Sequence, residues 1–343
     1  MLGFNLQEQN FLGSGNTVGI GINKNIYSEM YNISYMNPYA TRDAVSLGYN
    51  VFFRETDYGE FNVANYLTNS NGFGAQFGYP ISDISRLGFN ITYDKTDIDI
   101  GTLPAREIYD FVSVEGNIFE TLTAQLSWQQ VTLNRGLFPT DGASTVVSFS
   151  STIPGSDLSY YRFNIRQRYY QPLSSDFVFG FQGEIGYLDS YGDTEEIPFF
   201  QNFYAGGPRS LRGFESNTLG PRSTDAPCYE FNYEDGTCPN LLDTDGDGEA
   251  DAPYLNPYAN QGQRSRYRDA PIGGNIKVEG SLQLIFRLPF IEDQRSLRSA
   301  FFFDFGNVFS DNCKEYQINC SELSVDELRY SYGVGITLSL IHI

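Results

Sequence analysis

The chain has 343 residues and a formal net charge of −20, because 42 Asp and Glu outnumber 22 Lys and Arg. A field of this sign repels phosphate backbones and argues against a nucleic-acid partner. The single histidine, His342, argues against imidazole or zinc catalysis, and no apolar run approaches the ~20 residues of a membrane-spanning helix.

Alternation of apolar with polar residues runs along the chain and predicts thirteen β-strands. The expected ranges are 2–10, 16–27, 29–36, 43–54, 62–78, 84–95, 120–134, 143–153, 158–171, 176–189, 273–288, 297–309 and 329–338. In the segment 158–171, one face is apolar, with Phe163 and Ile165, and the other is charged, with Arg166 and Arg168. Such faces favour a barrel with lipid outside and water inside over an irregular soluble all-β protein.

The connections between these strands are of two kinds. Short turns are expected at 37–38, 78–80, 138–142, 171–172 and 288–289, and they alternate with longer polar loops. This asymmetry is typical of an outer-membrane barrel whose long loops lie outside the cell. The longest connection, about 190–272, is longer than a passive connection in a compact domain, so it is expected to be functional or disordered.

The long connection contains a motif. Residues 202–207 read Asn-Phe-Tyr-Ala-Gly-Gly, Leu211-Arg212-Gly213-Phe214 follows, and residues 217–221 read Asn-Thr-Leu-Gly-Pro. These segments resemble those of the BamA-type outer-membrane insertases, in which a hydrophobic-Arg-Gly-Phe loop folds back into the barrel. The resemblance extends over nearly the whole chain. The resemblance implies an all-β fold: an antiparallel transmembrane β-barrel, incomplete at about 13 of 16 strands, with the loop in its lumen.

The motif suits a loop anchored in a wet lumen. Arg212 offers a planar fork of donors that a carboxylate can bind bidentately, Gly213 lets the backbone pass close to the wall, and Phe214 adds apolar contact. Asp304 is the expected acceptor, because it alternates with Phe303 and its neighbours and should face inward. The alternative for Arg212 is a solvated loop arginine, and for Asp304 a lumen residue without a specific partner.

The resemblance also implies a second acidic acceptor on the strand after the loop, where this chain has Gln283. Glu279, four residues earlier on the same face, is the alternative acceptor, and Lys277 beside it could compete for the carboxylate.

The four cysteines form two local groups in expected external loops. Cys228 with Cys238 and Cys313 with Cys320 are the expected disulfides, although three pairings are formally possible and metal binding is a rival. The resemblance supports a disulfide in the long loop.

An acidic segment in the same loop has oxygen ligands at alternate positions, namely Asp243, Asp245, Asp247 and Asp251. The spacing resembles the front of a calcium loop, but Tyr254 stands where a bidentate Glu is required. Weak calcium binding and a hydrated acidic loop tip are the two interpretations.

The ends of the chain carry expectations of their own. Residues 1–337 are expected to be a partial barrel, with the periplasmic POTRA domains absent, and residues 338–343, including His342, are expected to be a non-native tail.

The resemblance implies a protein assembly factor in the outer membrane of a Gram-negative-type bacterium: the central insertase that folds and inserts β-barrel proteins. The implied partners are unfolded outer-membrane proteins, lipoproteins of the assembly machinery and outer-membrane lipid. No enzymatic activity, cofactor or nucleic acid is expected. The alternatives are a TamA-type or FhaC-type transporter barrel and, from a different class, a passive porin.

Overall fold

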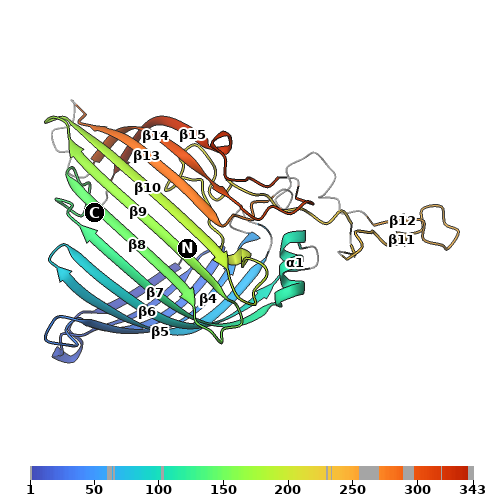
Figure 1. Cartoon of the computed structure of the whole chain (residues 1–343), viewed down its shortest axis with the longest axis horizontal. Coiled ribbons are helices and arrows are strands. Elements are labelled where there is room, and N and C mark those ends of the chain that lie inside the picture. Colours follow the sequence, from blue (N-terminus) through green and yellow to red (C-terminus); the bar gives the residue numbers. More distant parts are fainter. Residues whose placement is uncertain are drawn as a thin grey trace.

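The computed structural model describes residues 2–59, 64, 66–101, 104–228, 231–232, 234–254, 270–288, 297–317 and 319–338. Among these residues, thirteen strands form one antiparallel sheet, which curls around an interior (Figure 1). The strands are β1 (Leu2–Glu8), β2 (Thr17–Lys24), β3 (Ser28–Asn37), β4 (Ser46–Asp57), β5 (Leu67–Ser82), β6 (Ser85–Asp99), β7 (Ile118–Val131), β8 (Gly142–Thr152), β9 (Tyr160–Pro172), β10 (Phe177–Ser190), β13 (Ile276–Phe286), β14 (Leu297–Phe309) and β15 (Arg329–Leu338). The predicted antiparallel all-β fold is confirmed.

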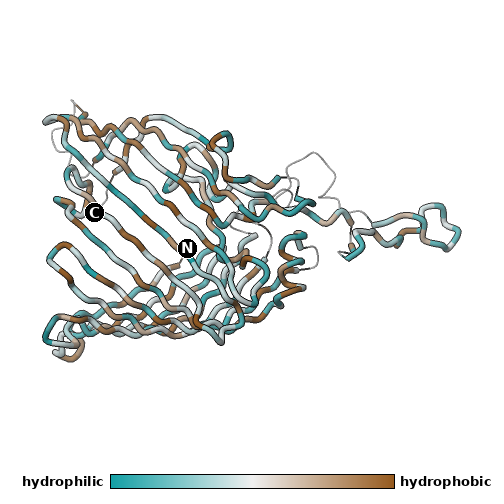
Figure 2. Tube along the Cα trace, in the orientation of Figure 1, coloured by the Kyte–Doolittle hydropathy of each residue, from teal (hydrophilic) through white to brown (hydrophobic). Residues whose placement is uncertain are grey.

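The register of the strands keeps apolar residues on one side of the sheet. Phe303 of β14 lies opposite Leu282 of β13 and Tyr332 of β15, and the exposed fractions of these three side chains are 40%, 38% and 85%. The next residue, Asp304, is fully buried on the other side. Figure 2 shows hydrophobic and hydrophilic residues alternating along the strands. The period-two pattern therefore separates an apolar outer face from a polar inner face.

Three features differ from the sequence-based expectation. The turns expected at 78–80 and 171–172 are wrong. β5 continues to Ser82, with a register shift after Pro80, and β9 continues to Pro172, because a proline is tolerated where pairing is irregular or ends. The helix α1 (Arg106–Glu115) and the hairpin of β11 (Asn240–Leu242) and β12 (Ala252–Pro253) were not predicted. Leu338, the first residue of the expected tail, ends β15, and residues 339–343 lie outside the described residues.

The helix α1 and several aromatic rings pack together at the end of the barrel where the connection from β6 to β7 lies. Ile108 and Phe111 of α1 are buried, and the ring of Phe111 packs edge-on against Phe199 with centroids 5.3 Å apart. Phe119 of β7 is 5.8 Å from Phe111 by the same measure. The 3-10 helices are η1 (Phe11–Gly13), η3 (Phe199–Gln201) and η4 (Val325–Glu327). In the described part of the chain, no helix is long and apolar enough to cross a bilayer.

The connection between β10 and β13 passes through the interior before it leaves the barrel. Isolated backbone bridges join Phe203 to Gly274 and Ala205 to Leu219, so the entering and returning segments lie side by side. A third bridge joins Arg222 to Pro271. Beyond this point the hairpin of β11 and β12 projects away from the sheet, on the side of α1 (Figure 1). The part of the connection around residues 203–222 can therefore contact the inner wall.

Candidate functional site

The motif residues lie in a tight turn at the inner tip of the long connection. The amide of Gly207 donates to the carbonyl of Leu211 at 3.1 Å, and Leu211 is fully buried. Gly206 has φ +107°, and a Cβ there would lie 2.4 Å from the carbonyl oxygen of Glu215. Only glycine fits this backbone, because both the conformation and the contact exclude a side chain. The turn presents Arg212 to the wall.

Arg212 and Asp304 form a bidentate ion pair. Nη2 of Arg212 lies 2.6 Å from Oδ1 of Asp304, and Nε lies 2.7 Å from Oδ2. The backbone amide of Arg212 also donates to Oδ2, at 3.1 Å. The Asp304 side chain is 0% exposed and that of Arg212 is 26% exposed. The structure thus joins the two residues that the sequence analysis proposed as anchor and acceptor, in the geometry that makes charge-assisted hydrogen bonds strong.

Two further residues hold the guanidinium, and sequence reasoning missed both. Nη2 of Arg212 donates to Oγ of Ser281 at 2.8 Å, and the guanidinium carbon lies 3.6 Å from the ring centroid of Phe302. Ser281 is the register partner of Asp304, so the correct cross-strand register was the signal that could have found it. Phe302 lies opposite Gly333, where a Cβ would come within 2.9 Å of the ring.

Glu279 and Gln283, the other expected acceptors, serve neighbouring groups instead. The hydroxyl of Ser210 donates to Glu279 at 2.5 Å, and Nζ of Lys277 lies 3.3 Å from the same carboxylate. Gln283 donates to Oγ of Ser281 at 3.2 Å. Among the described contacts, neither side chain binds Arg212. Glu279 is already engaged by a cation and a hydroxyl.

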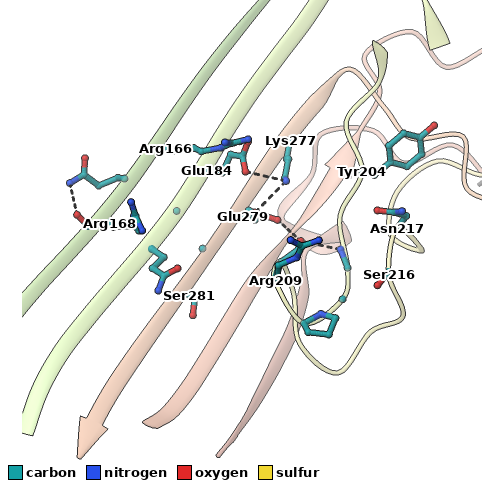
Figure 3. A pocket seen from close by; sticks show the side chains of 18 of the residues that line it. Arg166, Arg168, Glu184, Tyr204, Arg209, Ser216, Asn217, Lys277, Glu279 and Ser281 are labelled. Atoms are coloured by element: carbon teal, nitrogen blue, oxygen red, sulfur yellow. Dashed lines mark hydrogen bonds and ion pairs between the residues drawn. The ribbon is translucent and has the colours of Figure 1, made fainter. Parts of the chain in front are cut away.

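Lys277 separates two carboxylates on adjacent strands. Glu184 of β10 lies directly opposite Glu279 of β13, a like-charge pair that would be unfavourable by itself. Nζ of Lys277 lies 3.2 Å from Glu184 and 3.3 Å from Glu279, and it is drawn between them in Figure 3. Nε of Arg166 approaches Glu184 to 3.0 Å. Through Ser210, this network gives the tip of the connection a second attachment to the wall, beside the Arg212 anchor.

The four cysteines form two disulfides, each between cysteines of the same loop. Cys228 is bonded to Cys238, ten residues away, and Cys313 is bonded to Cys320, seven residues away. The first lies in the connection between β10 and β13, and the second lies between β14 and β15. Each closes a short loop and so restricts the unfolded chain locally.

Three of the four proposed calcium ligands lie together. The ligand atoms of Asp243, Asp245 and Asp247 lie within 4.8 Å of one another, and all three side chains are exposed. Asp251 instead accepts from the hydroxyl of Thr244 at 2.7 Å. Hydrogen bonds from the amides of Gly248 and Gly246 lower the pKa of Asp243. Calcium takes 6–8 oxygen ligands, so three carboxylates do not complete a site, and calcium binding stays a prediction.

Comparison with known proteins gives consistent matches over almost the whole chain. The Omp85 superfamily domain matches residues 10–340. The chain is 28% identical over 342 residues to the outer membrane protein assembly factor BamA of Neisseria meningitidis serogroup B. It is 23% identical over 342 residues to the sorting and assembly machinery component 50 homolog of mouse. It also resembles the crystal structure of Haemophilus ducreyi BamA lacking POTRA domains 1–3, with a TM-score of 0.78 and 27% identity.

These matches cover the chain more fully than they cover the relatives. The chain is covered to 97%, 98% and 98% by the Neisseria, mouse and Haemophilus proteins, respectively. In return, it spans 38% of the Neisseria protein, 61% of the mouse protein and 60% of the Haemophilus chain. The chain therefore spans between about two fifths and three fifths of the length of these relatives.

Proposed function

Because the chain belongs to the Omp85 superfamily, we propose that it forms the membrane barrel of an outer-membrane protein assembly factor, which folds and inserts β-barrel proteins. The protein is a β-barrel protein of the outer membrane of a Gram-negative-type bacterium. Its substrates are unfolded outer-membrane proteins. Its further partners are the lipoproteins of an assembly machinery, bound mainly through periplasmic domains of the whole protein, and the surrounding lipid.

The observation that carries this proposal is the attachment of the long connection to the wall. Arg212 contacts Asp304 and Phe302 on β14 and Ser281 on β13, and Gly213 lies beside Ser331 of β15. The tip of the loop therefore braces three consecutive strands from the inside. A barrel that must accept a new strand and stay folded needs such a brace, because the wall hydrogen bonds at the point of entry are broken.

Insertion itself requires no covalent step in this scheme. An incoming strand pairs with an exposed strand edge of the whole protein by β-augmentation, which satisfies backbone N–H and C=O groups that the bilayer cannot. Local thinning of the bilayer lowers the cost of entry, since mismatch costs a fraction of a kcal/mol per Å.

The test uses the full-length gene product in liposomes and an unfolded outer-membrane barrel protein as substrate. The substrate is expected to fold faster with the protein than without it. Its folding is measured by the change in electrophoretic mobility that heating causes. Arg212→Ala is expected to reduce the acceleration, and Arg42→Ala, which changes an exposed turn between β3 and β4, is the matched control. Steady ion conductance without any acceleration would support the porin instead.

A further inference from the structure

A polar cavity of about 930 Å³ lies between the inner wall and the tip of the long connection. The wall side comes from β8, β9, β10 and β13, and the loop side comes from residues 204–217 (Figure 3). Ile26 and Tyr27, from the turn between β2 and β3, also line it, so the cavity lies inside the curled sheet. Its wall residues lie on the polar face of the sheet, opposite the apolar outer face.

The charges that line this cavity do not cancel. Four cations, Arg166, Arg168, Arg209 and Lys277, face two carboxylates, Glu184 and Glu279. Both carboxylates are already engaged: Glu184 binds Arg166, Lys277 and Asn164, and Glu279 binds Lys277 and Ser210. Arg168 and Arg209 are exposed to the cavity and have no ion pair among the described residues. In a chain of net charge −20, two guanidinium groups that line the same cavity without an ion pair give it a local positive charge.

The cross-strand register places hydrogen-bond donors beside Arg168. Arg168 lies opposite Ser144 of β8 and Gln182 of β10, and Gln182 lies opposite Ser281 of β13. All four residues line the cavity. A row of guanidinium, hydroxyl and amide groups suits an oxyanion, because each can donate to an oxygen.

We propose that this cavity binds a small multivalent oxyanion of the phosphate class, held between Arg168 of the wall and Arg209 of the loop. Guanidinium forks match the geometry of phosphate oxygens, and a cavity of this volume has room for more than one phosphate group. The wall residues that line the cavity lie on the polar face of the sheet and not on its apolar face, so a soluble anion and not a lipid headgroup is the ligand of this proposal. The bound anion adds a third attachment between the loop and the wall.

The experiment is calorimetric titration of the full chain, folded in detergent micelles, with inorganic pyrophosphate at an ionic strength held constant with NaCl. Saturable binding is expected. Arg168→Gln and Arg209→Gln should each weaken it about tenfold or more, as for the loss of a charge-assisted interaction. Arg42→Gln, which removes the same charge from an exposed turn outside the cavity, should leave the affinity unchanged.

Absence of saturable binding at constant ionic strength would overturn the proposal. So would an equal loss in all three variants, since that indicates attraction to net charge and not to a site. Heat-modifiable mobility checks that each variant is folded, and Arg209→Gln keeps the test valid if Arg168→Gln fails to fold, because Arg209 lies on the loop. The result is independent of assembly activity, so failure here leaves the proposed function standing.

Discussion

Asp304 accepts three N–H groups from Arg212 and is completely shielded from solvent. A carboxylate buried in this way depends on its cation, because removal of one partner leaves the other charged and desolvated. Ser281 and Phe302 then fix the plane of the guanidinium from two sides. A lysine would keep the charge but could not make the bidentate contact or the same stacking.

Arg212→Ala should therefore lower the free energy of unfolding by about 3–5 kcal/mol, mostly because Asp304 is left buried without a cation. Arg212→Ala combined with Asp304→Asn should recover part of this loss, because the neutral amide carries no uncompensated charge. Urea titration of the reconstituted protein, read by heat-modifiable mobility, measures both. A double variant no more stable than Arg212→Ala would refute the charge argument.

Lys277 gives a second prediction at the same scale. Lys277→Met should destabilise the fold by a few kcal/mol, on the order of the loss for a broken partly buried ion pair, because Glu184 and Glu279 would face each other without the cation that lies between them, and Arg166 contacts Glu184 alone. Adding Glu279→Gln should restore stability, since only one carboxylate then remains. The same urea titration applies, and failure of the second change to rescue the first would refute the role of Lys277 in separating the two charges.

At the scale of elements, the strands were predictable from the sequence, but the helix α1 and the contacts of the long connection were not. Each strand repeats the same two-residue period over many positions, so thirteen ranges could be found without any knowledge of the partners. Asp304 was found by the same alternation. Ser281 was missed because its role depends on cross-strand register, and Phe302 was missed because its contact depends on where the loop tip lies. The helix α1 was missed because one short helix between loops depends on tertiary packing of residues such as Phe111.

The helix α1 holds the return segment of the long connection separately from the tip. The carboxylate of Glu107 accepts the amide of Thr224 at 3.0 Å and its hydroxyl at 2.6 Å, and the amide of Arg106 donates to the carbonyl of Thr224 at 2.9 Å. Glu107→Ala should increase hydrogen exchange around residues 222–226 and leave residues 210–214 protected, because the tip has its own anchor. Ser113→Ala, an exposed change on the same helix, is the control. Equal loss of protection at both segments would show that the connection opens as one unit.

At the scale of the whole molecule, the two faces of the sheet meet different solvents. Phe149 and Ser148 are neighbours on β8, and they point to opposite faces because side chains alternate along a strand. The Phe149 side chain is 46% exposed on the apolar outer face, and Ser148 shares its face with the cavity residues Ser144 and Val146. Substitutions at these two adjacent positions therefore test the lipid-facing and the lumen-facing side of the wall at nearly the same depth in the membrane.

Phe149→Arg should make the free energy of folding into liposomes less favourable by up to about 2–4 kcal/mol, the cost of a guanidinium facing lipid near the midplane of the bilayer. Ser148→Arg adds the same group to the wet interior and should cost much less, since water there can solvate the charge. Equilibrium folding into liposomes as a function of urea compares the two variants directly. If Ser148→Arg were the more damaging change, the face assigned to lipid would be the inner one, and the position of the long connection within the lumen would have to be abandoned with it.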